Sequence, residues 1–198
     1  MKKIILLLFI GALSFNLSAQ SSSLTAGLGL LNAKVRIQYE HGFGDMHSTG
    51  ANLGVYLQNW TGPRMEGFYR IYFGGDNEKG MFMQASAGAG MFSYALDTDD
   101  ATSFIQNGTS FDIYNDKNTW TTFGGGIGFG GKMTSRSGFV FESTIGFQIW
   151  TAPTPNYSSE YDEFLLLPNA VGAAETLGYY VVGPGFPLMF QMKFGKNF

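Results

Sequence analysis

The sequence predicts an all-β protein: an eight-stranded antiparallel up-and-down transmembrane β-barrel with short periplasmic turns and two long outer loops. Three observations lead to this prediction. Apolar and polar residues alternate with period two through most of the chain, as in half-buried strands. The links between the alternating segments fall into a short, polar class and a long class. Charged residues make up 14% of the chain, against about 25% in ordinary soluble domains, while aromatic residues reach 16%.

The N-terminal segment has the features of an export signal. Lys2 and Lys3 precede an apolar stretch, and the small residues Ser18 and Ala19 supply a cleavage site before Gln20. The apolar stretch is about twelve residues long, well short of the roughly 20 that a membrane-spanning helix needs. We therefore expect residues 1–19 to be a signal peptide and residues 20–198 to form one outer-membrane β-barrel domain.

Composition narrows the function classes. Without Lys2 and Lys3, 10 Lys and Arg remain against 15 Asp and Glu, which argues against nucleic-acid binding. The chain has no cysteine, so it has neither disulfides nor thiol-based catalytic or metal chemistry. No later segment contains 18 consecutive apolar residues, so no transmembrane helix is expected.

The first half of the chain supplies five predicted strands. They are Leu24–Leu30, Ala33–Glu40, Gly50–Trp60, Arg64–Phe73 and Met81–Ser93. Each sets an apolar face against a polar or glycine-rich face; in Ala33–Glu40, for example, Val35 and Ile37 oppose Arg36. The first segment alternates less clearly, but an even strand count requires an ascending strand before Ala33, with a tight outer turn near Leu31 and Asn32.

The second half supplies three more. Thr119–Lys132 and Gly138–Trp150 alternate throughout. In the last thirteen residues, FPLMFQMKFGKNF, every second residue counted back from Phe198 is apolar except Lys196. Most segments are about 10 residues long, which suits a tilted strand crossing a bilayer. Thr176–Val182 could add strand structure, so a count of ten stays open.

The links between the predicted strands fall into two classes of length, and we expect each class on one side of the membrane. HGFGDMH, GGDNEKG and TSRS are short and rich in turn residues, whereas residues 94–118 and 151–182 are long. Placing the C-terminus in the periplasm and counting backwards puts all three short links on one side and both long links on the other. Outer-membrane barrels have this arrangement, with short periplasmic turns and longer outer loops.

The charged residues of the strands share one set of faces, opposite the apolar set. They are Lys34, Arg36, Glu40, Glu66, Arg70, Lys132, Glu142 and Lys193. Because an eight-stranded barrel is just wide enough for side chains to fill its interior, we expect these residues to pair in the lumen while the apolar faces meet lipid. The alternative is a soluble sandwich or lipocalin-like barrel whose charged face is solvated.

Aromatic residues gather near the predicted strand ends. They are Tyr39, Trp60, Tyr69, Phe73, Trp120 and Trp150. Such positions form the aromatic girdles of membrane barrels. Trp60 and Trp150 fall on the inward parity, and they either join a girdle or cap the lumen.

At this point the sequence resembles a known group, the small eight-stranded outer-membrane barrels of Gram-negative bacteria (OmpX/OmpA-like). The signal peptide, the alternating segments and the terminal MFQMKFGKNF carry this resemblance. Tyr39-Glu40 and Tyr69–Phe73 also resemble an uncharacterised family of such barrels. The resemblance implies location in the cell outer membrane, contact with outer-membrane lipid and lipopolysaccharide, and insertion by the barrel assembly machinery. It further implies that Phe194 and Phe198 serve as the assembly signal, although Lys196 departs from the preferred apolar residue.

The sequence offers little catalytic or metal-binding chemistry. A lipid-modifying hydrolase or acyltransferase would need a serine with a histidine base, but the two histidines, His41 and His47, fall in an expected periplasmic turn. Those histidines with Asp45 make a weak metal site. The glycine run 124–131 lacks the Lys-Ser/Thr of a phosphate loop, and DTDD (97–100) lacks the glycine and glutamate of a calcium loop. We predict no cofactor and no metal; cation bridging between the acidic outer loops and lipopolysaccharide is a further possibility.

Three functions remain in order of preference. The first is a monomeric, non-enzymatic barrel with a filled lumen, serving envelope integrity or surface interaction through its outer loops. The second is a lipid A-modifying enzyme with an unrecognised site. The third is a small porin-like pore or a conduit for a hydrophobic molecule.

Overall fold

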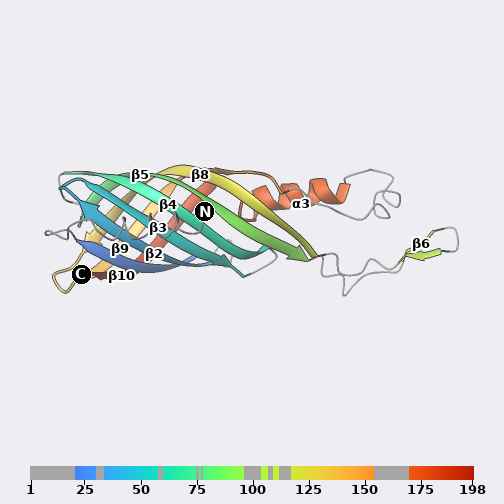
Figure 1. The fold of residues 1–198 in the computed structure, drawn as a ribbon, viewed down its shortest axis with the longest axis horizontal. Helices are drawn as coiled ribbons and strands as arrows, with labels where there is room; N and C mark the ends of the chain where they lie inside the picture. Colours follow the sequence, from blue (N-terminus) through green and yellow to red (C-terminus); the bar gives the residue numbers. More distant parts are fainter. Residues whose placement is uncertain are drawn as a thin grey trace, which may run out of the picture.

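The chain forms a closed barrel of eight antiparallel strands in the computed structural model, which describes residues 21–29, 34–57, 60–74, 76, 78–95, 104–106, 109–111, 117–153 and 170–198 (Figure 1). The barrel strands are β1 (Ser22–Gly29), β2 (Lys34–Phe43), β3 (His47–Tyr56), β4 (Trp60–Phe73), β5 (Gly80–Ala95), β8 (Lys117–Thr134), β9 (Phe139–Trp150) and β10 (Leu188–Asn197). The short strands β6 (Phe104–Gln106) and β7 (Thr109–Phe111) pair only with each other, and α3 (Ala170–Val181) is a helix between β9 and β10. The predicted eight-stranded up-and-down barrel is confirmed.

The barrel closes between its first and last strands. Each strand pairs with its neighbours along the chain, and β1 pairs antiparallel with β10. At the end of this seam the backbone of Ser22 donates to Phe198 at 3.0 Å, and Phe198 donates back at 2.8 Å. Closure removes the unpaired strand edges that an open sheet would expose.

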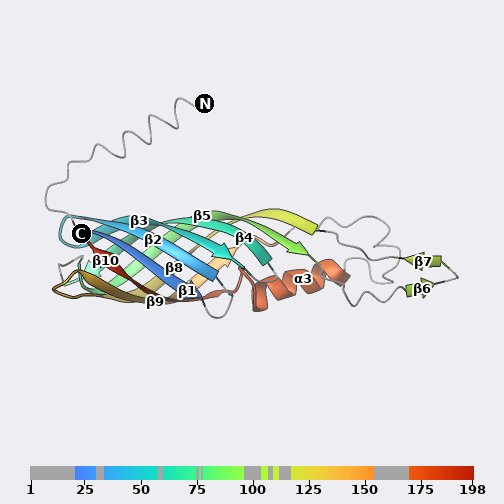
Figure 2. The same cartoon turned by 90° about the horizontal axis from the view of Figure 1, so that it is seen from below.

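The two ends of the barrel differ. The C-terminus and the short turns lie at one end, and α3 lies at the other (Figures 1 and 2). Each of the three short turns contains a glycine with positive φ, Gly44 at 61°, Gly74 at 108° and Gly138 at 81°, where a side chain would be strained. The three short turns that the sequence predicted therefore share one end, although Tyr56 and Trp60, where β3 ends and β4 begins, are only four positions apart at the other end. We call the end that carries α3 the outer mouth.

Several predicted boundaries were wrong. His41 and His47 belong to β2 and β3, because those strands extend to a turn of only three residues, 44–46. Trp60 begins β4 instead of ending the strand before it. Thr176–Val182 is not a strand: it lies largely in α3, so the ten-strand alternative is wrong. The predicted signal peptide lies outside the described residues.

Side chains alternate between the two faces of the barrel wall. Along β4 the pattern of buried and exposed residues has period two, with Arg64, Glu66 and Arg70 buried and Met65 and Tyr69 exposed. Large apolar side chains are exposed around the wall; examples are Ile149 (80%), Leu28 (69%), Phe147 (64%) and Ile127 (63%). A soluble barrel buries its apolar face, and this one buries its charged face instead.

Within the part of the chain that the structure describes, no helix combines the length and apolar character needed to cross a membrane.

Candidate functional site

The lumen of the barrel holds the charged residues that the alternation pointed to. Arg36, Glu40, Glu66, Arg70, Lys132, Glu142 and Lys193 are each at most 4% exposed. Lys34 is half-buried at the outer mouth, where its Nζ lies 3.4 Å from the Tyr56 hydroxyl. The lumen also contains the buried amides of Gln38, Gln84 and Gln191.

Arg70 joins two carboxylates at one level of the lumen. Its guanidinium donates to Glu142 through two bonds, of 2.6 Å and 2.8 Å, and to Glu40 at 3.0 Å. Lys193 Nζ is 2.6 Å from Glu142, and Lys132 Nζ is 3.0 Å from Glu40. Each carboxylate therefore meets two cations, from strands that are far apart in the sequence.

A second group surrounds Glu66 nearer the outer mouth. Glu66 accepts from Arg64 Nε at 2.8 Å and from Arg36 Nη2 at 3.1 Å. Arg64 also donates to Gln148 at 2.6 Å and to the Pro184 carbonyl at 3.0 Å. Its guanidinium lies 3.8 Å from the centre of the Trp150 ring. Arg64 therefore ties the ion pairs to the segment that follows α3.

We infer that these buried pairs specify the packing of the lumen more than they add to its stability. Transfer of two charges from water costs several kcal/mol per ion, and attraction between them roughly offsets that cost when the hydrogen bonds are complete. Loss of one partner leaves a buried charge alone, which costs about 3 to 5 kcal/mol. The network thus fixes the packing of the lumen.

Sequence reasoning missed Arg64. It shares the inward parity of Glu66 and Arg70 on the same strand, so the period-two pattern alone would have found it. In the structure Glu40 pairs with Arg70, and Glu66 pairs with Arg36.

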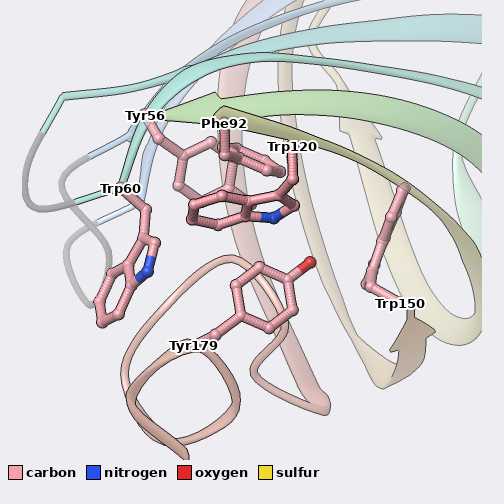
Figure 3. Close-up of a cluster of buried hydrophobic side chains, with 6 residues drawn as sticks. All are labelled: Tyr56, Trp60, Phe92, Trp120, Trp150 and Tyr179. Atoms are coloured by element: carbon pink, nitrogen blue, oxygen red, sulfur yellow. The ribbon is translucent and has the colours of Figure 1, made fainter. Parts of the chain in front are cut away.

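An aromatic cluster closes the lumen at the outer mouth (Figure 3). It consists of Tyr56, Trp60, Phe92, Trp120, Trp150 and Tyr179, each at most 6% exposed. Tyr56 and Phe92 meet edge to face with ring centres 5.1 Å apart. We call these six residues the aromatic cap. Trp60 and Trp150 therefore cap the lumen, whereas the girdle position expected for Trp120 is wrong because its side chain also points inward.

Helix α3 contributes the central ring of the cap. Tyr179 is fully buried between strand residues, with its ring centre 6.3 Å from that of Trp120 and 6.4 Å from that of Phe92. Gly185 passes so close that an added Cβ would lie 2.1 Å from the Tyr179 ring, so this position needs glycine. The neighbouring Tyr180 hydroxyl donates to the Trp150 carbonyl at 2.8 Å. Burial raises the pKa of the Tyr179 hydroxyl to about 12.

The histidines lie at the opposite end of the barrel from the cap. His41 Nδ1 is 2.9 Å from the Ser22 hydroxyl, and His47 Nδ1 is 2.9 Å from the Tyr69 hydroxyl. In the Ser22–His41 contact a hydroxyl, a possible nucleophile, lies within hydrogen-bond distance of an imidazole, a possible base. Among the described residues, no group of three or more histidine, cysteine or acidic side chains is placed to hold a metal ion. The acidic loop residues considered for cation binding, such as Asp97 and Asp99, lie outside the described part.

Comparison with known proteins adds one structural likeness. No family model and no curated protein matches the sequence. Among solved structures, the chain is similar to the crystal structure of the N-terminal beta-barrel domain of Pseudomonas aeruginosa OprF, with a TM-score of 0.48 and 14% sequence identity. That match covers 90% of this chain and 97% of the OprF domain. The barrel architecture itself rests on the strand pairing of this chain.

Proposed function

We propose that this chain is a non-enzymatic, monomeric barrel of the bacterial outer membrane, sealed across its lumen, that serves envelope integrity or surface interaction. The observation that carries the proposal is the inversion of the two faces: ion pairs fill the interior and large apolar side chains cover the wall. In water such a wall would aggregate, because exposed apolar area of this extent needs an apolar partner. Lipid tails supply that partner, and closure of the sheet satisfies the backbone.

The filled lumen supports a sealing role over a conducting one. Glu142 and Glu40 bridge across the interior through Arg70. At the outer mouth the aromatic cap covers this network. An eight-stranded barrel has room for little beyond its own side chains. Water and ions therefore have no wide path through the described part of the barrel.

Contact with the outside falls to the long loops. Residues 94–118 and 151–182 follow strands that end at the outer mouth, so they face the cell exterior if the short turns face the periplasm. Several acidic residues occupy these loops, such as Asp99, Asp112 and Glu163. We assign surface interaction, including contact with lipopolysaccharide, to these loops. The signal peptide and the assembly signal at Phe194 and Phe198 belong to the same proposal.

One observation favours the second candidate, a lipid-modifying enzyme. The Ser22–His41 hydrogen bond places a hydroxyl next to an imidazole at the turn end of the barrel. Lipid A acyl chains are in the outer leaflet, at the other end, so this pair would meet phospholipid instead. We rank it below the sealed barrel because Ser22 is only 6% exposed, which leaves little access for a lipid substrate to its hydroxyl.

Reconstitution into liposomes that contain lipopolysaccharide and phospholipid distinguishes the candidates. The sealed barrel predicts no conductance above that of empty bilayers, no flux of small apolar solutes, and unchanged acyl chains by mass spectrometry. If the wild-type protein alters the acyl chains and the Ser22→Ala variant leaves them unchanged, the enzyme would be established instead. Steady conductance or solute flux would establish the pore or the conduit.

A further inference from the structure

The buried charges of the lumen do not balance. Among the described residues, five fully buried cationic side chains stand against three carboxylates. The cations are Arg36, Arg64, Arg70, Lys132 and Lys193, and the anions are Glu40, Glu66 and Glu142. Every carboxylate is already shared by two cations. A net positive charge sealed from bulk water is costly, and proteins meet that cost by pairing the charge.

The excess charge gathers around a small cavity near the outer mouth. The cavity is lined on its lumen side by Lys34, Arg36, Lys193 and Gln191, and on its wall side by Gly27 and the apolar Leu28, Phe190 and Met192; no acidic residue lines it. Gly27 stands opposite Arg36 in the β1–β2 register, and β10 packs closely against it: an added Cβ would meet the Met192 carbonyl and the Lys193 side chain. The cavity volume is about 10 Å³, enough to hold the centre of about one water-sized particle.

Two side chains at the cavity are buried without partners for several polar atoms. Arg36 is 4% exposed; its Nη2 binds Glu66, but its Nε and Nη1 meet no hydrogen-bond partner in the described structure. Gln191 is 6% exposed, and neither its Nε2 nor its Oε1 is bonded. Buried polar atoms are nearly always paired, so unpaired N–H donors around one cavity point to an occupant.

We propose that this cavity binds a single small monovalent anion, such as chloride, held by Arg36, Lys34 and the Gln191 amide. Three of the four unpaired atoms, Arg36 Nε and Nη1 and Gln191 Nε2, are N–H donors, and two of them belong to a cationic group, which suits an anion. One negative charge would offset part of the excess of positive charge. A phosphate or carboxylate is too large for a cavity of this volume. This site goes beyond the sealing function and does not require it.

The test measures anion-dependent stability of the refolded protein in detergent micelles. Urea midpoints are determined in sodium chloride, sodium bromide and sodium gluconate at equal ionic strength. Because a ligand of the folded state stabilises it in proportion to the logarithm of its concentration, the midpoint should rise with chloride or bromide and not with gluconate. Crystals grown in sodium bromide should show an anomalous peak in contact with Arg36 Nε.

The most direct variant introduces a negative charge at the cavity. Gln191→Glu places a carboxylate where the anion would bind, so the midpoint should become independent of chloride. Gln84→Glu makes the same change at another level of the lumen, beside Arg70, and should keep the chloride dependence even if it lowers stability. Equal midpoints in chloride and gluconate for the wild-type protein, or a bromide structure with no peak at the cavity, would overturn the proposal. A chloride response that survives Gln191→Glu would also overturn it.

Discussion

Arg70 and Glu142 form a two-bond pair in the centre of the barrel, with Nη2 and Nη1 of the guanidinium 2.6 Å and 2.8 Å from the two carboxylate oxygens. The residues come from β4 and β9 and are 72 positions apart in the chain. Both are completely buried. Such a parallel arrangement is the strongest form of ion pair, and it fixes the distance between opposite walls of the lumen.

The first prediction concerns this pair. Arg70→Met should lower the free energy of unfolding by about 3 to 5 kcal/mol, because Glu142 and Glu40 each lose a cation and stay buried. Removal of both charges, in Arg70→Met with Glu142→Met, should cost less than the sum of the two single changes. Urea unfolding in micelles measures each variant.

An exposed pair serves as the control for the first prediction. Lys79 and Asp76 lie 3.7 Å apart in a short turn, and Lys79 is 69% exposed. Lys79→Met should change the free energy of unfolding by less than about 1 kcal/mol. Strictly additive costs for Arg70 and Glu142 would show that the pair is not coupled.

The second prediction concerns the aromatic cap. All three tryptophans of the chain belong to the cap, so tryptophan fluorescence reports on it alone. Tyr179→Ala removes the buried ring of α3 and should lower the free energy of unfolding by about 3 to 5 kcal/mol, as for a large core aromatic residue. The variant should shift the tryptophan emission to the red and raise its quenching by acrylamide. Leu177→Ala alters an exposed residue of the same helix and should leave both unchanged. Equal quenching in the two variants would contradict the cap.

The third prediction is an alkaline opening of the cap. The pKa of Tyr179 is raised to about 12 in the folded protein by burial, against about 10 for a free tyrosine. Since the folded state holds this proton more tightly, its contribution to stability is complete below pH 10 and is lost as pH rises to about 12. Acrylamide quenching should therefore rise over that interval. Tyr179→Phe keeps the ring without the ionisable hydroxyl, and a transition unchanged in this variant would assign it to another group.

The fourth prediction concerns assembly. Phe198 and Phe190 are both exposed on the outer face of the last segment, at 69% and 57%. If Phe198 acts as an assembly signal, Phe198→Ala should reduce the amount of folded, heat-modifiable protein in the outer membrane. Phe190→Ala, a matched loss of apolar surface, should reduce it far less. Both purified variants should refold in micelles, which separates assembly from stability; equal yields in cells would contradict the role.

The alternation of apolar and polar residues predicted the barrel because most of its strands pair with the next strand along the chain. Alternation along β4 and β9 determines which side chains share a face, and the lengths of the links determine the order of strands. The first strand followed from the need for an even number of strands, and closure followed from the need to pair every backbone group in lipid. The inward position of Arg36, Arg70 and Glu142 could be inferred in the same way.

Contacts between side chains from different strands, and the position of helix α3, could not be predicted from the alternation. The sharing of Glu142 between Arg70 and Lys193 depends on the width of the lumen, which alternation does not give. Helix α3 begins in a segment whose apolar residues have no clear period, and its return to the mouth depends on the fit between Tyr179 and residues of the barrel wall. Trp120 was misplaced for another reason: it shares the inward parity of Lys132 on the same strand, so the period-two pattern alone would have placed it in the lumen.

The measurement that tests the central claim most directly is the accessibility of spin labels in lipid bilayers. The chain has no cysteine, so single changes such as Ile127→Cys, Phe147→Cys and Phe190→Cys can be labelled without background. If the apolar wall faces lipid, these labels should collide readily with oxygen and poorly with a water-soluble nickel chelate, whereas Lys79→Cys in the short turn should show the reverse. Free access of the nickel chelate to the labels at Ile127, Phe147 and Phe190 would contradict the account.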